Sequence, residues 1–244
     1  MLAIVRASLR PRPIRSLSIP CALHQPSRWF SHSLSRLVGE ASSPPKLTYP
    51  DPPTANHSDL DSFISYARRT GLDEKSTVYV GTHYEYKVSR ALSQYGFHLK
   101  RIGGASDYGT DLVGTWTLPS SSTAPLRVLV QCKAGTQRVG PQHIRELEGA
   151  FVGAPVGWRG TGVLGVLASE RPATKGVRDS LGRSKWPMVY MCCSKEGAVS
   201  QMVWNQCAEE LGLEEYGVSI RRGDDVEALV LLRNGRVVPL LEEK

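Results

Sequence analysis

Apolar strands that alternate with amphipathic helices are the feature that most limits how this chain can fold. The segments 126–133 and 162–169 are apolar runs of strand length. The segment between them, 139–150, has the pattern of a helix, and a further helix is predicted over 173–181. Because strands alternate with helices from Val78 onward, the sequence predicts an α/β layered domain.

Two neighbouring predicted strands carry polar side chains at the ends that meet. The first strand opens with Asp111, and the second ends in Gln131-Cys132-Lys133. If the strands form a hairpin folded near Ser122, Asp111 falls opposite Lys133. Gln131 then shares a face with Lys133, since side chains alternate along a strand. A one-residue slip would turn Asp111 away, so the predicted convergence depends on the register.

An acidic side chain on an upstream helix is a possible fourth member of this group. Glu85 borders the buried stripe of a predicted helix that segment 79–82 leads into. The stripe consists of Tyr84, Val88, Ala91, Leu92 and Tyr95. Taken alone, Thr82 and Glu85 have the spacing of a capping box, in which Glu85 binds the backbone at the helix start. The residues that follow in the sequence favour a site role instead.

In this order, the residues resemble the PD-(D/E)XK restriction-endonuclease-like superfamily and its Mrr-like branch. That branch combines a helix Glu, a glycine-flanked Asp-x-Gly-x-Asp segment and a Gln-x-Lys motif, which match Glu85, 107–111 and 131–133. The resemblance spans about residues 79–193 and implies a mixed β-sheet flanked by helices. With its N-terminal segment, the chain also resembles the fungal mitochondrial family named required for respiratory growth protein 7, which implies a mitochondrial protein needed for respiration.

The resemblance implies a Mg²⁺-dependent phosphodiesterase, in which Mn²⁺ can substitute. Asp111 and the backbone carbonyl of Cys132 would be metal ligands, and Glu85 would bind the metal directly or through water. Magnesium prefers hard oxygen ligands and keeps several waters. Lys133 would orient the attacking water or stabilise charge on the phosphorane. Gln131 offers a carbonyl ligand without the negative charge that an acid would supply.

Four further residues are weaker candidates for contacts with nucleic acid. Asp107 has either a site role or the role of a turn residue between glycines. Gln137 and Arg138 lie in a predicted turn near the site, and Arg145 lies on the following helix. His143 is on the same helix, where a solvated position is the simpler interpretation. The resemblance implies nucleic acid as the partner, with DNA as the leading candidate.

The N-terminal segment has the composition of a mitochondrial transit peptide. Residues 1–39 contain six arginines, many serines, no lysine and no acidic residue. The sequence around Arg28 predicts cleavage before Ser31, and the matrix is the expected location. Cleavage there would remove five of the six arginines and leave 25 basic against 23 acidic residues, which lowers the formal net charge from +7 to about +2. Nucleic-acid binding would then need a local basic patch. The alternative is a basic tail that itself binds nucleic acid.

The remaining chain divides into a linker and one domain. Residues 31–57 are Ser/Pro-rich, and 58–240 suffice for a single domain with its nuclease-like core at 79–193. A short capped helix is predicted from Ser58. A C-terminal helix is predicted over 202–213, followed by a β-hairpin around Asn234-Gly235. No apolar run is long enough to span a bilayer, and the cysteines lack C-x-x-C spacing.

Three classes of function are compatible with these features. The leading prediction is an endonuclease or exonuclease that acts on DNA in mitochondrial genome maintenance. The second is a non-catalytic nucleic-acid-binding protein that retains the nuclease fold. The third is an assembly factor of mitochondrial ribosomes or respiratory complexes. Binding without turnover would identify the second class, and nuclease-resistant co-sedimentation with those particles would identify the third.

Overall fold

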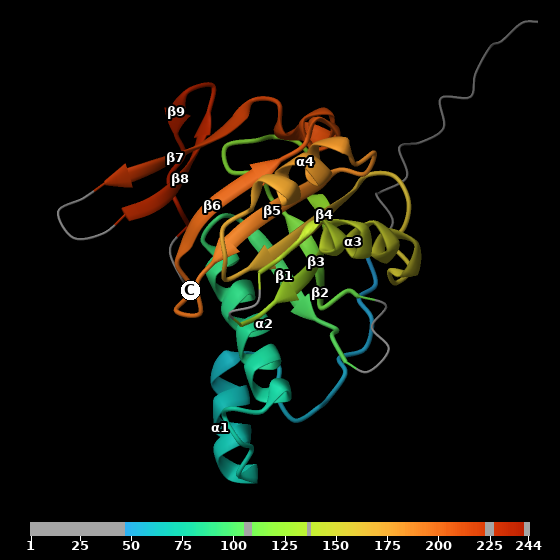
Figure 1. The fold of residues 1–244 in the computed structure, drawn as a ribbon, viewed down its shortest axis with the longest axis vertical. Helices are drawn as coiled ribbons and strands as arrows, with labels where there is room; N and C mark the ends of the chain where they lie inside the picture. The colour runs from blue at the N-terminus through green and yellow to red at the C-terminus, as the bar shows by residue number, and fades with distance from the viewer. Residues whose placement is uncertain (1–46, 105–108, 136–137, 223–226, 242–244) are drawn as a thin grey trace, which may run out of the picture. The chain divides into compact units, whose positions relative to one another are not determined.

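A six-stranded mixed sheet organises the chain, with its strands in sequence order from β1 to β6 (Figure 1). The computed structural model describes residues 47–104, 109–135, 138–222 and 227–241. The strands are β1 Phe97–Arg101, β2 Leu112–Trp116, β3 Leu126–Lys133, β4 Val163–Ser169, β5 Met188–Cys193 and β6 Val199–Trp204. The predicted α/β class, a mixed sheet flanked by helices, is confirmed.

The strand directions follow from the connections between them. β1, β2 and β3 pair antiparallel, as do β5 and β6. β3, β4 and β5 run parallel to one another, because helices α3 (Pro141–Gly153) and α4 (Lys175–Arg183) connect them as crossovers. The strands predicted at 126–133 and 162–169 and the helix predicted at 139–150 are therefore confirmed.

Each face of the sheet is covered by different elements. Helix α2 (Thr77–Ser93) packs on one face through Tyr84, Val88 and Leu92, which join Val128 and Val130 of β3 in one core. Helices α3 and α4 cover the opposite face, where their side chains join strand residues in a second core. The second core also takes in Leu47 and Tyr49, which precede the first helix.

A separate C-terminal sheet completes the first core. It contains β7 (Tyr216–Arg222), β8 (Glu227–Arg233) and β9 (Arg236–Val237), paired antiparallel. The turn between β8 and β9 is formed by Asn234 and Gly235, both with positive φ, as the hairpin prediction requires. Leu229 and Leu231 of β8 reach the same core as α2, so this hairpin extends the hydrophobic interior.

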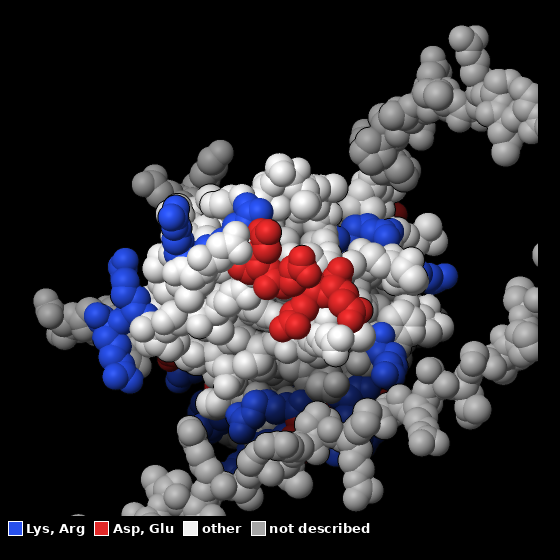
Figure 2. Space-filling model, turned by 90° about the horizontal axis from the view of Figure 1, so that it is seen from above, with Lys and Arg blue, Asp and Glu red and all other residues white. Residues whose placement is uncertain are grey.

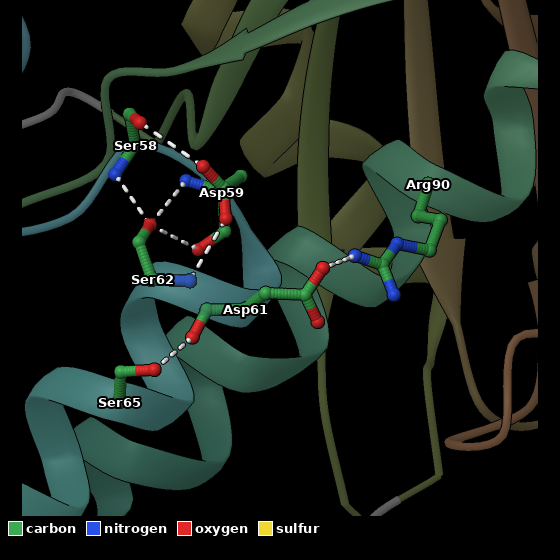
Figure 3. A network of polar contacts seen from close by, with 6 residues as sticks. All are labelled: Ser58, Asp59, Asp61, Ser62, Ser65 and Arg90. Atoms are coloured by element: carbon green, nitrogen blue, oxygen red, sulfur yellow. Dashed lines mark hydrogen bonds and ion pairs between the residues drawn. The ribbon is translucent and has the colours of Figure 1, made fainter. Parts of the chain in front are cut away.

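Helix α1 (Leu60–Thr70) packs on α2 rather than on the sheet. Asp59 and Ser62 cap its start reciprocally, and Arg90 of α2 forms an ion pair with Asp61 at 2.5 Å (Figure 3). The predicted helix is present, with its cap one residue later than Ser58. Both partners of the ion pair are largely exposed, so apolar contacts of Leu60, Phe63 and Tyr86 supply most of the attachment.

The start of α2 differs from the sequence prediction. The N-cap is Ser76, whose side chain accepts a hydrogen bond from Tyr79 N at 3.1 Å. Val78 and Thr82 therefore lie inside the helix, which rules out the alternative of a capping box formed by Thr82 and Glu85. The helix begins earlier than predicted because Ser76 caps it, so that Tyr79 and Val80 are helical although their residue types favour strands.

The register between β2 and β3 also differs from the prediction. Leu112 pairs with Val130, so Asp111 falls opposite Gln131 and not opposite Lys133. The hairpin is centred one residue earlier than Ser122, which moves each partner by two positions. A two-residue shift preserves the face of every side chain.

Two C-terminal helix predictions need correction. The predicted helix at 202–213 begins as the end of β6, and only α5 (Gln206–Ala208) and the π-helix η1 (Glu209–Leu213) follow. Asn205 separates strand from helix, because its side chain caps Ala208 N. Helix α4 begins two residues later than predicted, after the N-cap Thr174.

Gly114 in β2 offers a test of the packing between β1 and β2. A Cβ at this position would lie 1.9 Å from His98 O and 2.9 Å from Leu99 Cα. We expect Gly114→Ala to lower the free energy of unfolding by about 3 kcal/mol, since backbone atoms must move. Gly149→Ala is the matched control, because a Cβ at position 149 meets nothing within 4 Å. This substitution should stabilise α3 by roughly 0.5–1 kcal/mol. Urea denaturation of both variants measures the difference, and equal effects would contradict this packing.

Candidate active site

Three strand ends meet at one edge of the six-stranded sheet and carry the candidate residues there. β1 ends at Arg101, β2 begins at Leu112 and β3 ends at Lys133. Because both strand pairs are antiparallel, these three ends lie at the same edge. Helix α2 passes over this edge, where Glu85 lies. The structure thus brings Glu85, Asp111, Gln131 and Lys133 to one region.

Asp111 is fixed by hydrogen bonds to β3 and to the segment that follows β1. Its N–H donates to Val130 O at 2.9 Å, and its carbonyl accepts from Ile102 N and Gly103 N, both at 2.8 Å. Its side-chain Oδ2 accepts from Cys132 N at 2.6 Å. The carboxylate is therefore held in one orientation at the junction of β1, β2 and β3.

Gln131 places a buried amide beside this junction. The residue is 5 % exposed, and its Oε1 is buried without a hydrogen-bond partner among the described residues. Gly109 approaches its other side: a Cβ on Gly109 would lie 3.3 Å from Gln131 Nε2. Gly109 has a φ of 80°, which also favours glycine here. A buried acceptor without a partner costs about 1–3 kcal/mol, so it marks a position where a ligand would be stabilising.

The side chain of Lys133 forms an ion pair with helix α3. Its Nζ donates to Glu146 Oε2 at 2.9 Å, and the two side chains are 31 % and 47 % exposed. Solvent screens such a pair and leaves it worth about 0–1 kcal/mol. The ammonium group is therefore held near the sheet edge by a contact that an anionic ligand can replace.

Glu85 forms a buried ion pair with Arg101. The guanidinium binds Glu85 Oε2, and the two side chains are only 13 % and 12 % exposed. Arg101 also contacts Thr82 Oγ1 at 3.4 Å and lies 5.9 Å from the centre of the Tyr86 ring. The sequence made Arg101 a candidate for a basic patch, and its ion pair with Glu85 is what sequence reasoning missed. A basic residue two positions before Gly103 in the motif was the available signal.

The carboxylates of Glu85 and Asp111 both lie next to Gly103. A Cβ on Gly103 would be 3.3 Å from Asp111 Oδ1 and 3.3 Å from Glu85 Oε2. The two oxygens are therefore no more than twice that distance apart. Burial, and next the charges of Asp111 and Glu85, hold the pKa of the Cys132 thiol well above its usual value. Cys132 thus stays a neutral thiol beside the carboxylates.

The weaker sequence candidates occupy different positions. Asp107 and Gln137 lie outside the described residues. Arg145 is exposed on α3. His143 is a capping residue rather than a solvated one, since Gly140 N donates to its Nδ1 at 3.0 Å. Arg138 is exposed and lines a cavity on the α4 side.

Comparison with known proteins identifies the family. The family model described as Required for respiratory growth protein 7 matches residues 76–124 and 119–221. The chain belongs to the required for respiratory growth protein 7 family. The matched range includes the candidate site residues Glu85, Asp111, Gln131 and Lys133. No solved structure matches the chain.

Relatives in this family are mitochondrial proteins of fungi. An uncharacterized mitochondrial protein of Schizosaccharomyces pombe is 33% identical over 158 residues, which cover 64% of this chain and 62% of the relative. Required for respiratory growth protein 7 of Vanderwaltozyma polyspora is 33% identical over 137 residues, 39% of this chain and 54% of the relative. The Saccharomyces cerevisiae member is 26% identical over 168 residues, 52% and 69% of the two chains.

Membership in the respiratory growth protein 7 family defines the compartment and the broad role. The match spans less than two thirds of the first two relatives. The relatives are named mitochondrial and required for respiratory growth, so this is a mitochondrial protein of respiratory growth. Among the described residues, no helix is long and apolar enough to cross a membrane. The predicted transit peptide, residues 1–30, lies outside the described part.

The Glu85–Arg101 ion pair generates a double-mutant test. We expect Glu85→Gln or Arg101→Met alone to lower the free energy of unfolding by about 3–5 kcal/mol, because each leaves a buried charge without its partner. The double variant Glu85→Gln/Arg101→Met should recover much of that loss. The exposed pair of Asp61 and Arg90 is the control, with each single change below about 1 kcal/mol. Additive losses in the double variant would contradict the buried pair.

Proposed function

We propose that this protein is a Mg²⁺-dependent phosphodiesterase of the mitochondrial matrix that cleaves nucleic acid, with DNA as the first substrate to examine. The observation that carries the proposal is the pairing of Asp111 with Gln131 at one sheet edge. Asp111 is a fixed carboxylate, and Gln131 has a buried carbonyl oxygen without a partner among the described residues. Carboxylate and amide oxygens at neighbouring strand ends are the kind of donor that a hard cation takes.

The donor set fits magnesium better than zinc. No group of three or more His, Cys, Asp or Glu side chains that could hold a metal lies among the described residues. Structural zinc sites need four such ligands and catalytic ones need three. Magnesium is commonly held by one or two carboxylates and keeps several waters. Asp111, Gln131 and the backbone carbonyl of Cys132 would hold it here, and the bound ion would polarise a phosphate oxygen and activate a water.

The remaining residues then have distinct chemical roles. Lys133 would exchange its ion pair with Glu146 for a phosphate oxygen and stabilise the charge that develops in the transition state. Arg101 neutralises one of the two carboxylates, so Glu85 would contribute through a water and not as a fully charged ligand. Gly103 has no side chain, and a Cβ at this position would press against both carboxylates.

A non-catalytic nucleic-acid-binding or assembly protein is the second candidate function. The observation that favours it is that Glu85 and Lys133 are both engaged in ion pairs. A site that only binds nucleic acid needs no free carboxylate. Binding without turnover would support this candidate over the first.

The central prediction is metal-dependent cleavage. Purified protein incubated with plasmid, linear or single-stranded DNA and with RNA should cleave at least one of them when Mg²⁺ or Mn²⁺ is added. Asp111→Asn and Lys133→Met should each lower the rate by about 100-fold or more, the size seen when one transition-state contact is removed. Gel electrophoresis of end-labelled substrates measures the rate.

Matched substitutions in the turn between α1 and α2 control for changes in charge. Asp73→Asn and Lys75→Met remove the same charges from exposed positions away from the sheet edge, and we expect no more than a twofold change in rate. Absence of cleavage with every substrate, or equal cleavage by the Asp111 and Lys133 variants, would contradict the proposal.

A further inference from the structure

A cavity of about 420 Å³ lies beside the candidate active site, on the side of α4. It is lined by Arg138, Val139, Arg171, Pro172, Ala173 and Thr174. Lys133 of β3 is in register with Ser169 of β4, and the two strands are parallel. The loops that carry Arg138 and Arg171 therefore leave the sheet at the edge where Lys133 lies.

The loop that carries Arg171 is held rigidly by hydrogen bonds. Arg171 N donates to Ser169 Oγ at 3.2 Å, and Arg171 O accepts from Tyr190 Oη at 2.6 Å. Ser169 and Tyr190 are both completely buried. Two residues after Arg171, Ala173 N donates to Gln201 Oε1 at 2.7 Å. This loop is thus a fixed support for an exposed arginine.

The opposite wall of the cavity is anchored by packing. Val139 is 4 % exposed and belongs to the core beneath α3 and α4. The first turns of the two helices touch, since a Cβ on Gly176 would lie 3.1 Å from Pro141 Cγ. Arg138 immediately precedes this contact. The cavity therefore has two anchored walls, each with one arginine.

The cavity is positively charged, and none of its described lining residues is acidic. Within the described ranges, neither Arg138 nor Arg171 has an ion-pair partner, whereas Arg101 and Lys133 each have one. The nearest acid in the sequence is Glu170, whose Oε1 is engaged by Gly135 N at 2.7 Å. Two guanidinium groups without counter-ions favour an anion with several oxygens.

We propose that this cavity binds a backbone phosphate of the nucleic-acid strand, next to the phosphate that is cleaved. The inference rests on the proposed function for its substrate. The cavity supplies the local basic patch that nucleic-acid binding requires in a chain whose net charge is close to zero without the predicted transit peptide. Figure 2 shows one face of the molecule with a cluster of acidic side chains at its centre, and such a cluster disfavours a polyanion.

The test is binding of a labelled oligonucleotide without divalent metal, measured by fluorescence anisotropy over a salt series. Arg138→Gln/Arg171→Gln should weaken binding by at least about tenfold. It should also reduce the slope of log K against log salt by about 0.7 to 0.9, the value for one lost phosphate contact. Arg138→Lys/Arg171→Lys keeps the charges and should retain the slope while losing part of the affinity.

The control variant is Arg68→Gln/Arg69→Gln, which removes two exposed arginines from the end of α1. We expect its binding to stay within twofold of the parent. If the Arg138/Arg171 glutamine variant binds as tightly as the parent, the inference is overturned even where cleavage is observed. If binding depends on both arginines but no cleavage occurs, the proposed function fails and the phosphate site remains.

Competition by inorganic phosphate shows whether the cavity binds the backbone phosphate of a strand or free phosphate. At constant ionic strength, we expect it to compete only weakly, because a strand engages Lys133 and both arginines together. Competition as strong as that of an unlabelled oligonucleotide, independent of oligonucleotide length, would identify a free-phosphate site and overturn the inference.

Discussion

The hydrogen bonds of Asp111 are the constraint on which the rest of the site depends. Its main chain joins the end of β1 to β3, and its carboxylate accepts the N–H of Cys132. These contacts fix where β1 turns away, which brings Gly103 between Asp111 and Glu85. They also fix the register that places Gln131 beside Asp111. The carboxylate uses Oδ2 for this bond, and its Oδ1 lies 3.3 Å from where a Cβ of Gly103 would be.

The charge balance at this edge then decides what chemistry is feasible. Two carboxylates this close would repel each other in a poorly hydrated place. Arg101 offsets one of these charges with a nearly buried guanidinium, which leaves about one negative charge for a divalent cation. Lys133 is kept nearby by an exposed glutamate that a phosphate can displace. Arg138 and Arg171 continue the positive charge into the neighbouring cavity. The proposed metal, the scissile phosphate and the adjacent phosphate would therefore each take a separate position.

Local sequence patterns predicted the central strands because these are apolar and buried on both faces. β3, β4 and α3 follow the expected ranges closely. β1 was not predicted, because His98, Lys100 and Arg101 make it look like a surface segment. The partner of Asp111 was misplaced by two residues, since the turn around Ser120 with its positive φ is not readable from a Ser/Pro loop. The ion pair of Glu85 with Arg101 depends on how β1 meets α2, which no local pattern encodes. The described parts still bring together the four residues singled out from the sequence.

Binding of Mn²⁺ tests the central claim most directly, because it does not depend on finding the right substrate. Electron paramagnetic resonance can count free and bound Mn²⁺ during a titration of the purified protein. The account predicts one bound ion in the parent protein, weaker binding in Gln131→Leu and no bound ion in Asp111→Asn. If the parent binds no Mn²⁺, or if Asp111→Asn binds it as tightly as the parent, the assignment of this sheet edge as a metal-dependent active site is contradicted.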